Sequence, residues 1–86
     1  MKVRKRDGSL QDFDIDKVKL TLERVSDELN RPFTGSDLRI LTKAIEEGVF
    51  KTGNEVIDSS EIHKIVVNEL EKYDFVEIAK AYDNFK

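Results

Sequence analysis

The chain has 86 residues, of which 38% are hydrophobic and 38% are charged, and its formal net charge is −3. We expect residues 1–86 to fold as a single domain, and the absence of cysteine excludes a thiolate metal site, a disulfide framework and a cysteine nucleophile, and suits a cytoplasmic protein. No apolar run reaches membrane-spanning length, and the negative net charge argues against nucleic acid as a partner, because duplex binding depends on many phosphate contacts.

The chain opens with a basic segment that predicts a β-hairpin. Four of its first six residues are Lys or Arg. Asp7-Gly8 predicts a two-residue type I′ turn, because both central residues of that turn take positive φ. In this register Val3 and Leu10 face the core, and Phe13 belongs to the start of the first helix. A basic patch of this size on an acidic chain suits one polyphosphate better than extended nucleic acid.

Two amphipathic helices follow the hairpin. Asp14 is a suitable N-cap for a helix over about residues 15–29, with Phe13 and Val18 placed as a hydrophobic staple. Thr34 and Asp37 are placed to cap a second helix over about residues 36–50. Helical spacing predicts that the buried side chains are Ile15, Val18, Leu22, Val25 and Leu29 in the first helix and Leu38, Leu41, Ile45 and Val49 in the second.

The second half begins with a strand, Glu55-Val56-Ile57, which is too short for a helix. Asp58 with Glu61, and Asp74 with Glu77, have the spacing of capping boxes that begin two further helices. We expect their inward residues to be Ile62, Val66 and Leu70, then Phe75, Ile78, Ala79, Tyr82 and Phe85. The predicted fold class is α+β: a small three-stranded sheet, made of the hairpin and one short strand, with four helices.

Two groups of polar residues have the chemistry of a phosphate site. Lys5, Arg6 and Lys17 place cations beside a helix N-terminus, although the spacing alone favours a simpler interpretation, in which charges protect an exposed edge strand. Ser59 and His63 lie four residues apart and share one helix face. They either meet the same phosphate or serve as a capping serine and an exposed histidine.

The sequence does not indicate an enzyme. It has no supported Ser/His/Asp arrangement, no glycine-rich phosphate loop and no His-x-x-x-His. Asp12, Asp14 and Asp16 alternate as in a calcium loop, but the central glycine and the distal bidentate glutamate are missing. Helix capping explains these carboxylates better, and we expect no metal site.

Four motifs in order resemble the ATP-cone domain, from residue 1 to about residue 82. They are Val3-x-Lys5-Arg6-Asp7-Gly8, Phe13-Asp14-x-x-Lys17-Val18, Ser59-Ser60-Glu61-Ile62 and Ile78-Ala79-x-x-Tyr82. The resemblance implies a regulatory module that binds ATP or dATP, with or without Mg²⁺, and signals through quaternary structure without hydrolysing the nucleotide. Such modules stand at the N-terminus of ribonucleotide reductase subunits and behind a zinc ribbon in the repressor of reductase genes.

The resemblance also implies how the base is held. Val3 and Val18 would pack against the adenine, and Asp14 and Gln11 would face the base edge. Some members have Glu where this chain has Gln11, so an acceptor is kept and a charge is lost.

The same resemblance assigns the phosphates to a second set of residues. Lys5 and Arg6 would contact them from the hairpin and Lys17 from the first helix, while Ser59 and His63 would close the site from the third helix. Many members continue beyond the position of Lys86 with Tyr- and Arg-rich residues that supply a further cation.

We therefore expect an allosteric ATP or dATP sensor that is not an enzyme, the N-terminal regulatory domain of a ribonucleotide reductase. Its protein partners would be a second copy or the remainder of a reductase subunit. Met1 directly before the first motif favours a native N-terminus, and the lack of cysteine pairs ahead of it argues against an intact zinc-ribbon repressor. The alternative is a helical module that docks protein or RNA through the basic hairpin.

Overall fold

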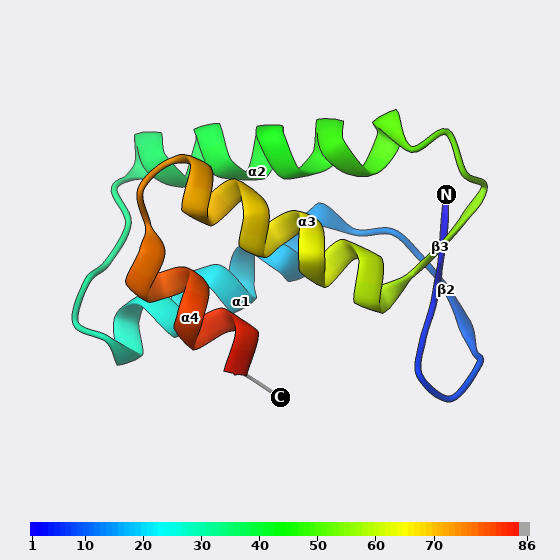
Figure 1. Ribbon diagram of the computed structural model, residues 1–86, viewed down its shortest axis with the longest axis horizontal. Helices are drawn as coiled ribbons and strands as arrows, with labels where there is room; N and C mark the ends of the chain where they lie inside the picture. The colour runs from blue at the N-terminus through cyan, green and yellow to red at the C-terminus, as the bar shows by residue number, and fades with distance from the viewer. Residues whose placement is uncertain (85–86) are drawn as a thin grey trace.

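The computed structural model describes residues 1–84 and has the predicted α+β fold, with one three-stranded sheet and four helices (Figure 1). Figure 1 shows α2 and α3 spanning the molecule, with the hairpin at one end and α4 at the other. In chain order the elements are β1 (Lys2–Arg4), β2 (Leu10–Asp12), α1 (Ile15–Glu28), α2 (Gly35–Lys51), β3 (Val56–Asp58), α3 (Ser59–Lys72) and α4 (Val76–Asn84).

The sheet has the strand order β2-β1-β3, so the first strand lies in the middle. β1 pairs antiparallel with β2 and parallel with β3, and its Val3 lies opposite Gln11 on one side and Ile57 on the other. Because paired residues share a face, Gln11 projects on the same side as Val3. Leu10 lies opposite Arg4 and is 53% exposed. The prediction that Leu10 faces the core is therefore wrong.

The hairpin turn explains that error. Gly8 alone in the turn has positive φ, at +86°, so the predicted type I′ turn is also wrong. Lys5 N–H donates to the Ser9 carbonyl (2.8 Å) and Gly8 N–H to the Lys5 carbonyl (2.9 Å), which encloses a three-residue loop over residues 6–8. This is the arrangement of a type I turn followed by a bulge with glycine in the left-handed region. One extra loop residue shifts the register by one and reverses the faces.

The first two helices begin where the sequence predicts. The Asp14 carboxylate accepts a hydrogen bond from Asp16 N–H (2.9 Å) at the start of α1. At the start of α2 the Thr34 hydroxyl accepts from Asp37 N–H (3.0 Å), and the Asp37 carboxylate accepts from Thr34 N–H (3.3 Å), which completes a capping box. Both caps satisfy backbone N–H groups that a helix N-terminus leaves free.

The two capping boxes predicted in the second half are wrong. Asp58 is the N-cap of α3, but within residues 1–84 its side chain accepts no capping hydrogen bond, and it faces Arg4 Nη1 at 3.6 Å instead. Asp74 does not cap α4 but belongs to the turn that follows α3. Its φ is +68°, and its N–H donates a hydrogen bond to the Glu71 carbonyl (3.0 Å). The Glu77 carboxylate, predicted to complete the second box, forms an ion pair with Arg31 instead, with 3.1 Å between Oε2 and Nε.

The core lies between the helices and the inner face of the sheet, and its residues follow the predicted helical spacing with some exceptions. Leu29 is 37% exposed because α1 ends at Glu28, and Phe85 lies outside the described residues. Ile15, Val18, Leu38, Phe75 and Tyr82 are only partly buried. The buried residues of the four helices are Leu22, Val25, Ser26, Leu41, Ile45, Val49, Ile62, Val66, Leu70, Ile78 and Ala79. Within residues 1–84, no helix combines the length and apolar character needed to cross a membrane.

Candidate functional site

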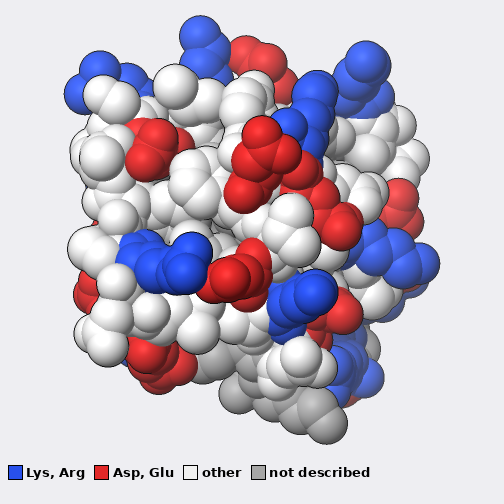
Figure 2. All heavy atoms as spheres, turned by 60° about the vertical axis from the view of Figure 1, so that its left-hand side comes forward, with Lys and Arg blue, Asp and Glu red and all other residues white. Residues whose placement is uncertain are grey.

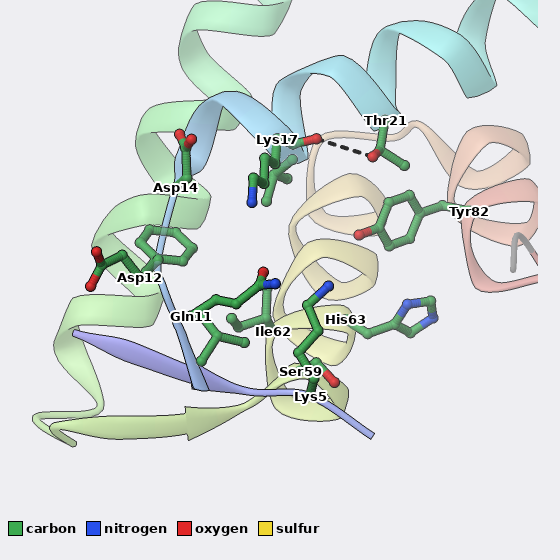
Figure 3. A pocket seen from close by; sticks show the side chains of 13 residues that line it. Lys5, Gln11, Asp12, Asp14, Lys17, Thr21, Ser59, Ile62, His63 and Tyr82 are labelled. Atoms are coloured by element: carbon green, nitrogen blue, oxygen red, sulfur yellow. Dashed lines mark hydrogen bonds between the residues drawn. The ribbon is translucent and has the colours of Figure 1, made fainter. Parts of the chain in front are cut away.

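A pocket of about 250 Å³ opens between the hairpin, the start of α1, the first turns of α3 and the end of α4 (Figure 3). Thirteen residues line it. Eight of the nine predicted site residues are among them, namely Val3, Lys5, Gln11, Asp14, Lys17, Val18, Ser59 and His63. The ninth, Arg6, lies outside this pocket and lines an adjoining cleft. The fold thus gathers side chains that are far apart in the sequence.

One side of the pocket is apolar. Val3 is 9% exposed and Ile62 is 8% exposed, and both line the pocket together with Val18. Phe13 adds an aromatic ring, which is held edge-on against Phe50 with 5.8 Å between ring centroids. The sequence placed Phe13 in the hydrophobic staple at the start of the first helix and Ile62 among the inward residues of the third helix, and it predicted neither at the site. Their neighbours in the motifs, Asp14 and Ser59, were the available indication that they lie at the site.

Polar groups stand at the edge of this apolar surface. Gln11 extends from β2 into the pocket (Figure 3), and its amide can both donate and accept. The Asp14 carboxylate is fixed by its capping hydrogen bond, which leaves acceptor capacity on the side chain. Asp12 also lines the pocket, but the Lys2 ammonium donates a hydrogen bond to it and lowers the pKa of its carboxyl. A purine edge needs such donors and acceptors beside an apolar surface.

Asp14 combines a structural role with a predicted binding role, and two substitutions separate them. Asp14→Ala should lower the free energy of unfolding by about 1 kcal/mol because it removes the cap, whereas Asp14→Ser should stay within about 0.5 kcal/mol of the wild type because serine caps as well. Both should reduce the preference for ATP over GTP, since neither side chain reaches the base edge. Urea unfolding and calorimetric titration measure the two effects. An unchanged preference in Asp14→Ser would confine Asp14 to capping.

The other side of the pocket is cationic and continues into a cleft of about 590 Å³. Pocket and cleft share Lys5, Ser59 and His63. Within residues 1–84, no ion pair is formed by Lys5, Lys17 or the cleft residues Arg6 and Lys64. The free N–H groups at the start of α3 add to the positive potential.

This surplus of positive charge is local. Figure 2 shows the molecule turned so that the end away from the hairpin comes forward, and on that face Lys and Arg alternate with Asp and Glu. Away from the pocket and the cleft, Arg31 and Glu77 form an ion pair with 3.1 Å between Nε and Oε2. An anionic ligand would therefore be attracted to the hairpin end rather than to that face.

His63 is held on the α4 side of the pocket. Its Nε2 lies 2.9 Å from Asp83 Oδ1, and its ring stacks on Tyr82 with 4.9 Å between centroids at 27° (Figure 3 shows the two rings). Burial raises the pKa of the Tyr82 phenol above its usual value. Tyr82 was predicted only as a core residue, and Asp83 was not predicted at all, because nothing local in the sequence indicates a pair 20 positions apart.

Comparison with known proteins finds a matching family model and several curated relatives. The family model described as "ATP cone domain" matches residues 1–84. The curated relatives include the transcriptional repressor NrdR of Tropheryma whipplei strain Twist, 30% identical over 84 residues, or 94% of this chain and 56% of the relative. The NrdR of Leifsonia xyli subsp. xyli is 28% identical over 92 residues, with 100% and 57% covered. The chain thus spans about half the length of these relatives.

These relatives correct one expectation from the sequence. The net charge argued against nucleic acid as a partner, but the relatives are transcriptional repressors, a class of protein that acts at DNA. The argument failed because the net charge describes the electrostatics of these 86 residues alone, whereas the relatives are about twice as long. An acidic regulatory domain is compatible with a DNA-directed protein.

Proposed function

The chain belongs to the ATP-cone domain family, and we propose that its pocket binds ATP or dATP as a regulatory ligand. The base would lie against Val3 and Val18 with its edge toward Gln11 and Asp14. The phosphates would extend past Lys5 toward the cleft. The observation that supports this most is the polarity of the pocket, which is apolar on one side and on the other bears cations that form no ion pair within residues 1–84.

The two connected spaces suit the two parts of a nucleotide. The pocket, at about 250 Å³, is slightly smaller than most ligand pockets. The adjoining cleft offers a further 590 Å³ or so beside Arg6 and Lys64. A nucleoside in the first and a phosphate chain in the second would satisfy both surfaces, since charge-assisted hydrogen bonds to phosphate are strong. Mg²⁺ would accompany the phosphates as part of the ligand.

We propose that the ligand is a signal and is not a substrate. His63 is the residue nearest in type to a general base, and its Nε2 is engaged with Asp83 Oδ1 at 2.9 Å, so this nitrogen is not free to take a proton from an attacking water. The domain should therefore leave ATP intact. Chromatography of ATP after prolonged incubation tests this, and release of ADP at a rate that rises with protein concentration would contradict it.

Thermal unfolding with a nucleotide panel tests the binding proposal. At a concentration about one hundred times the dissociation constant, ATP or dATP should stabilise the fold by about 2.7 kcal/mol. GTP at the same concentration should have little effect, because the base edge is matched to adenine. Titrations with Mg²⁺ and with EDTA separate the metal complex from the free nucleotide. No change in melting temperature with millimolar ATP or dATP would refute the proposal.

A second proposal concerns the function of the protein that carries this domain. The motifs are those of the ATP-cone domain, which stands both in ribonucleotide reductase subunits and in the repressor of reductase genes, and the curated relatives are transcriptional repressors named NrdR. We propose that the nucleotide controls ribonucleotide reduction, through the enzyme or through its genes. The full-length protein distinguishes these routes: dATP should alter either its reductase activity or its binding to promoter DNA. If neither responds to dATP, the proposal fails.

A further inference from the structure

We propose that Asp83 determines how strongly the site favours ligands with many phosphates. By holding His63 toward α4 and adding a negative charge to the cleft, it weakens binding more as the phosphate charge of the ligand increases. This inference rests on the proposed function of the pocket as a nucleotide site.

The contact with Asp83 fixes the orientation of the His63 imidazole. His63 lines both the pocket and the cleft, whereas Asp83 lines the cleft only. The His63 side chain is 34% exposed, and its Nε2 lies 2.9 Å from Asp83 Oδ1. The ring of Tyr82, the preceding residue of α4, stacks on the His63 ring with 4.9 Å between the ring centroids. Two consecutive residues of α4, Tyr82 and Asp83, therefore fix the orientation of a ring that belongs to α3.

A phosphate and Asp83 compete for the same nitrogen. Nε2 carries at most one hydrogen, and carboxylate and phosphate oxygens are both acceptors for it. A phosphate that approaches His63 through Nε2 must displace the carboxylate. Adenosine has no phosphate and does not enter this competition.

The carboxylate also acts through its charge. It shares the cleft with Arg6 and Lys64, so it offsets part of the attraction that these cations exert on an anion. Helix stability does not explain its presence, because a negative charge in the last turn of a helix is opposed by the helix dipole. The last turn of α4 also holds no basic residue that would offset the negative charge of Asp83. Asp83 is 63% exposed, so its replacement by asparagine should leave the fold intact.

Calorimetric titration of Asp83→Asn with adenosine, AMP, ADP and ATP tests the proposal. The affinity for adenosine should equal that of the wild type. The gain should rise along the series to about fivefold for ATP, because the variant removes one like charge from a hydrated cleft and also the carboxylate that competes for Nε2. Asp83→Glu keeps the charge and should show a smaller gain. Glu77→Gln changes the net charge equally on the same helix, but Glu77 lines neither the pocket nor the cleft, so it should show no gain.

A double-mutant cycle shows whether the effect passes through His63. In a His63→Gln background, Asp83→Asn should produce a gain clearly smaller than fivefold, because the competition for Nε2 no longer exists. A gain of the same size in both backgrounds would contradict the part of the proposal that assigns His63 as the intermediate. Weaker binding of the Mg²⁺–ATP complex by Asp83→Asn would mean that Asp83 supports the ligand, and would overturn the proposal.

Inorganic tripolyphosphate separates this inference from the proposed function. It carries the phosphate charge without a base, so Asp83→Asn should bind it several times more tightly than the wild type. If tripolyphosphate shows this gain and no adenine nucleotide binds, the nucleotide function fails while the role of Asp83 stands. If adenine nucleotides bind and Asp83→Asn alters neither ATP nor tripolyphosphate affinity, the role of Asp83 fails alone. Absence of binding by both ligands would refute both.

Discussion

Replacement of Lys17 by alanine is expected to weaken ATP binding by about tenfold or more and to leave adenosine binding unchanged, and Lys5→Ala should behave alike. Each removes a charge-assisted hydrogen bond, and hydrogen bonds to charged groups contribute about 1.5–3 kcal/mol. Both side chains line the pocket, and in the described part of the chain neither forms an ion pair. The free energy of unfolding without ligand should therefore change by less than about 0.5 kcal/mol.

Lys19→Ala is the matched control for this prediction. Lys19 lies on α1 two residues beyond Lys17, is exposed, and is not among the residues that line the pocket. Its removal changes the net charge equally, so calorimetric titration of the three variants separates local contacts from the overall field. If Lys19→Ala lost as much ATP affinity as Lys17→Ala, general electrostatics would explain the effect. Equal losses for adenosine and ATP would place the phosphates elsewhere.

Local patterns in the sequence predicted the order of the elements, because caps and helical spacing act over a few residues. They were less successful where a distant residue intervenes. Asp58 has the spacing of a capping box, but Arg4, on the neighbouring strand β1, faces its carboxylate. Asp74 likewise has the spacing, but the end of α3 places it in the left-handed region at φ +68°. Neither the contact with Arg4 nor the left-handed backbone of Asp74 can be predicted from the four residues that define a capping box.

At the candidate site, too, the sequence motifs predicted part of the arrangement, and contacts between distant residues were not predicted. Family motifs selected residues that meet in one pocket, because three of the four motifs supply site positions from the hairpin, α1 and α3. The fourth motif lies on α4 and includes Tyr82, but no residue of α4 was predicted to lie at the site. The contact between His63 and Asp83 depends on how α4 packs across α3, and helix packing is set by many core side chains together. The loop at Gly8 had a comparable effect, since one extra residue in the turn places Gln11 rather than Leu10 on the face of the sheet that carries Val3 and lines the pocket.

Leu22→Ala is expected to lower the free energy of unfolding by about 3 kcal/mol, within the range of about 2–5 kcal/mol for buried leucine truncations. Leu22 is fully buried (0% exposed) on α1, the helix that carries Lys17 and Val18. Domains of this size have a total stability of roughly 4–13 kcal/mol, so the variant should unfold at much lower urea concentration. Leu20→Ala removes the same atoms from the same helix at a side chain that is 64% exposed, and should change stability by less than about 0.5 kcal/mol.

Nucleotide should restore most of what Leu22→Ala removes. Leu22 does not line the pocket, so the folded variant should bind ATP with unchanged affinity. Ligand at about one hundred times its dissociation constant then adds about 2.7 kcal/mol to wild type and variant alike, because it binds only the folded state. Urea unfolding with and without ATP measures both increments. A much smaller increment in Leu22→Ala would mean that the pocket depends on the packing of α1. Equal destabilisation by Leu22→Ala and Leu20→Ala would contradict the placement of the core.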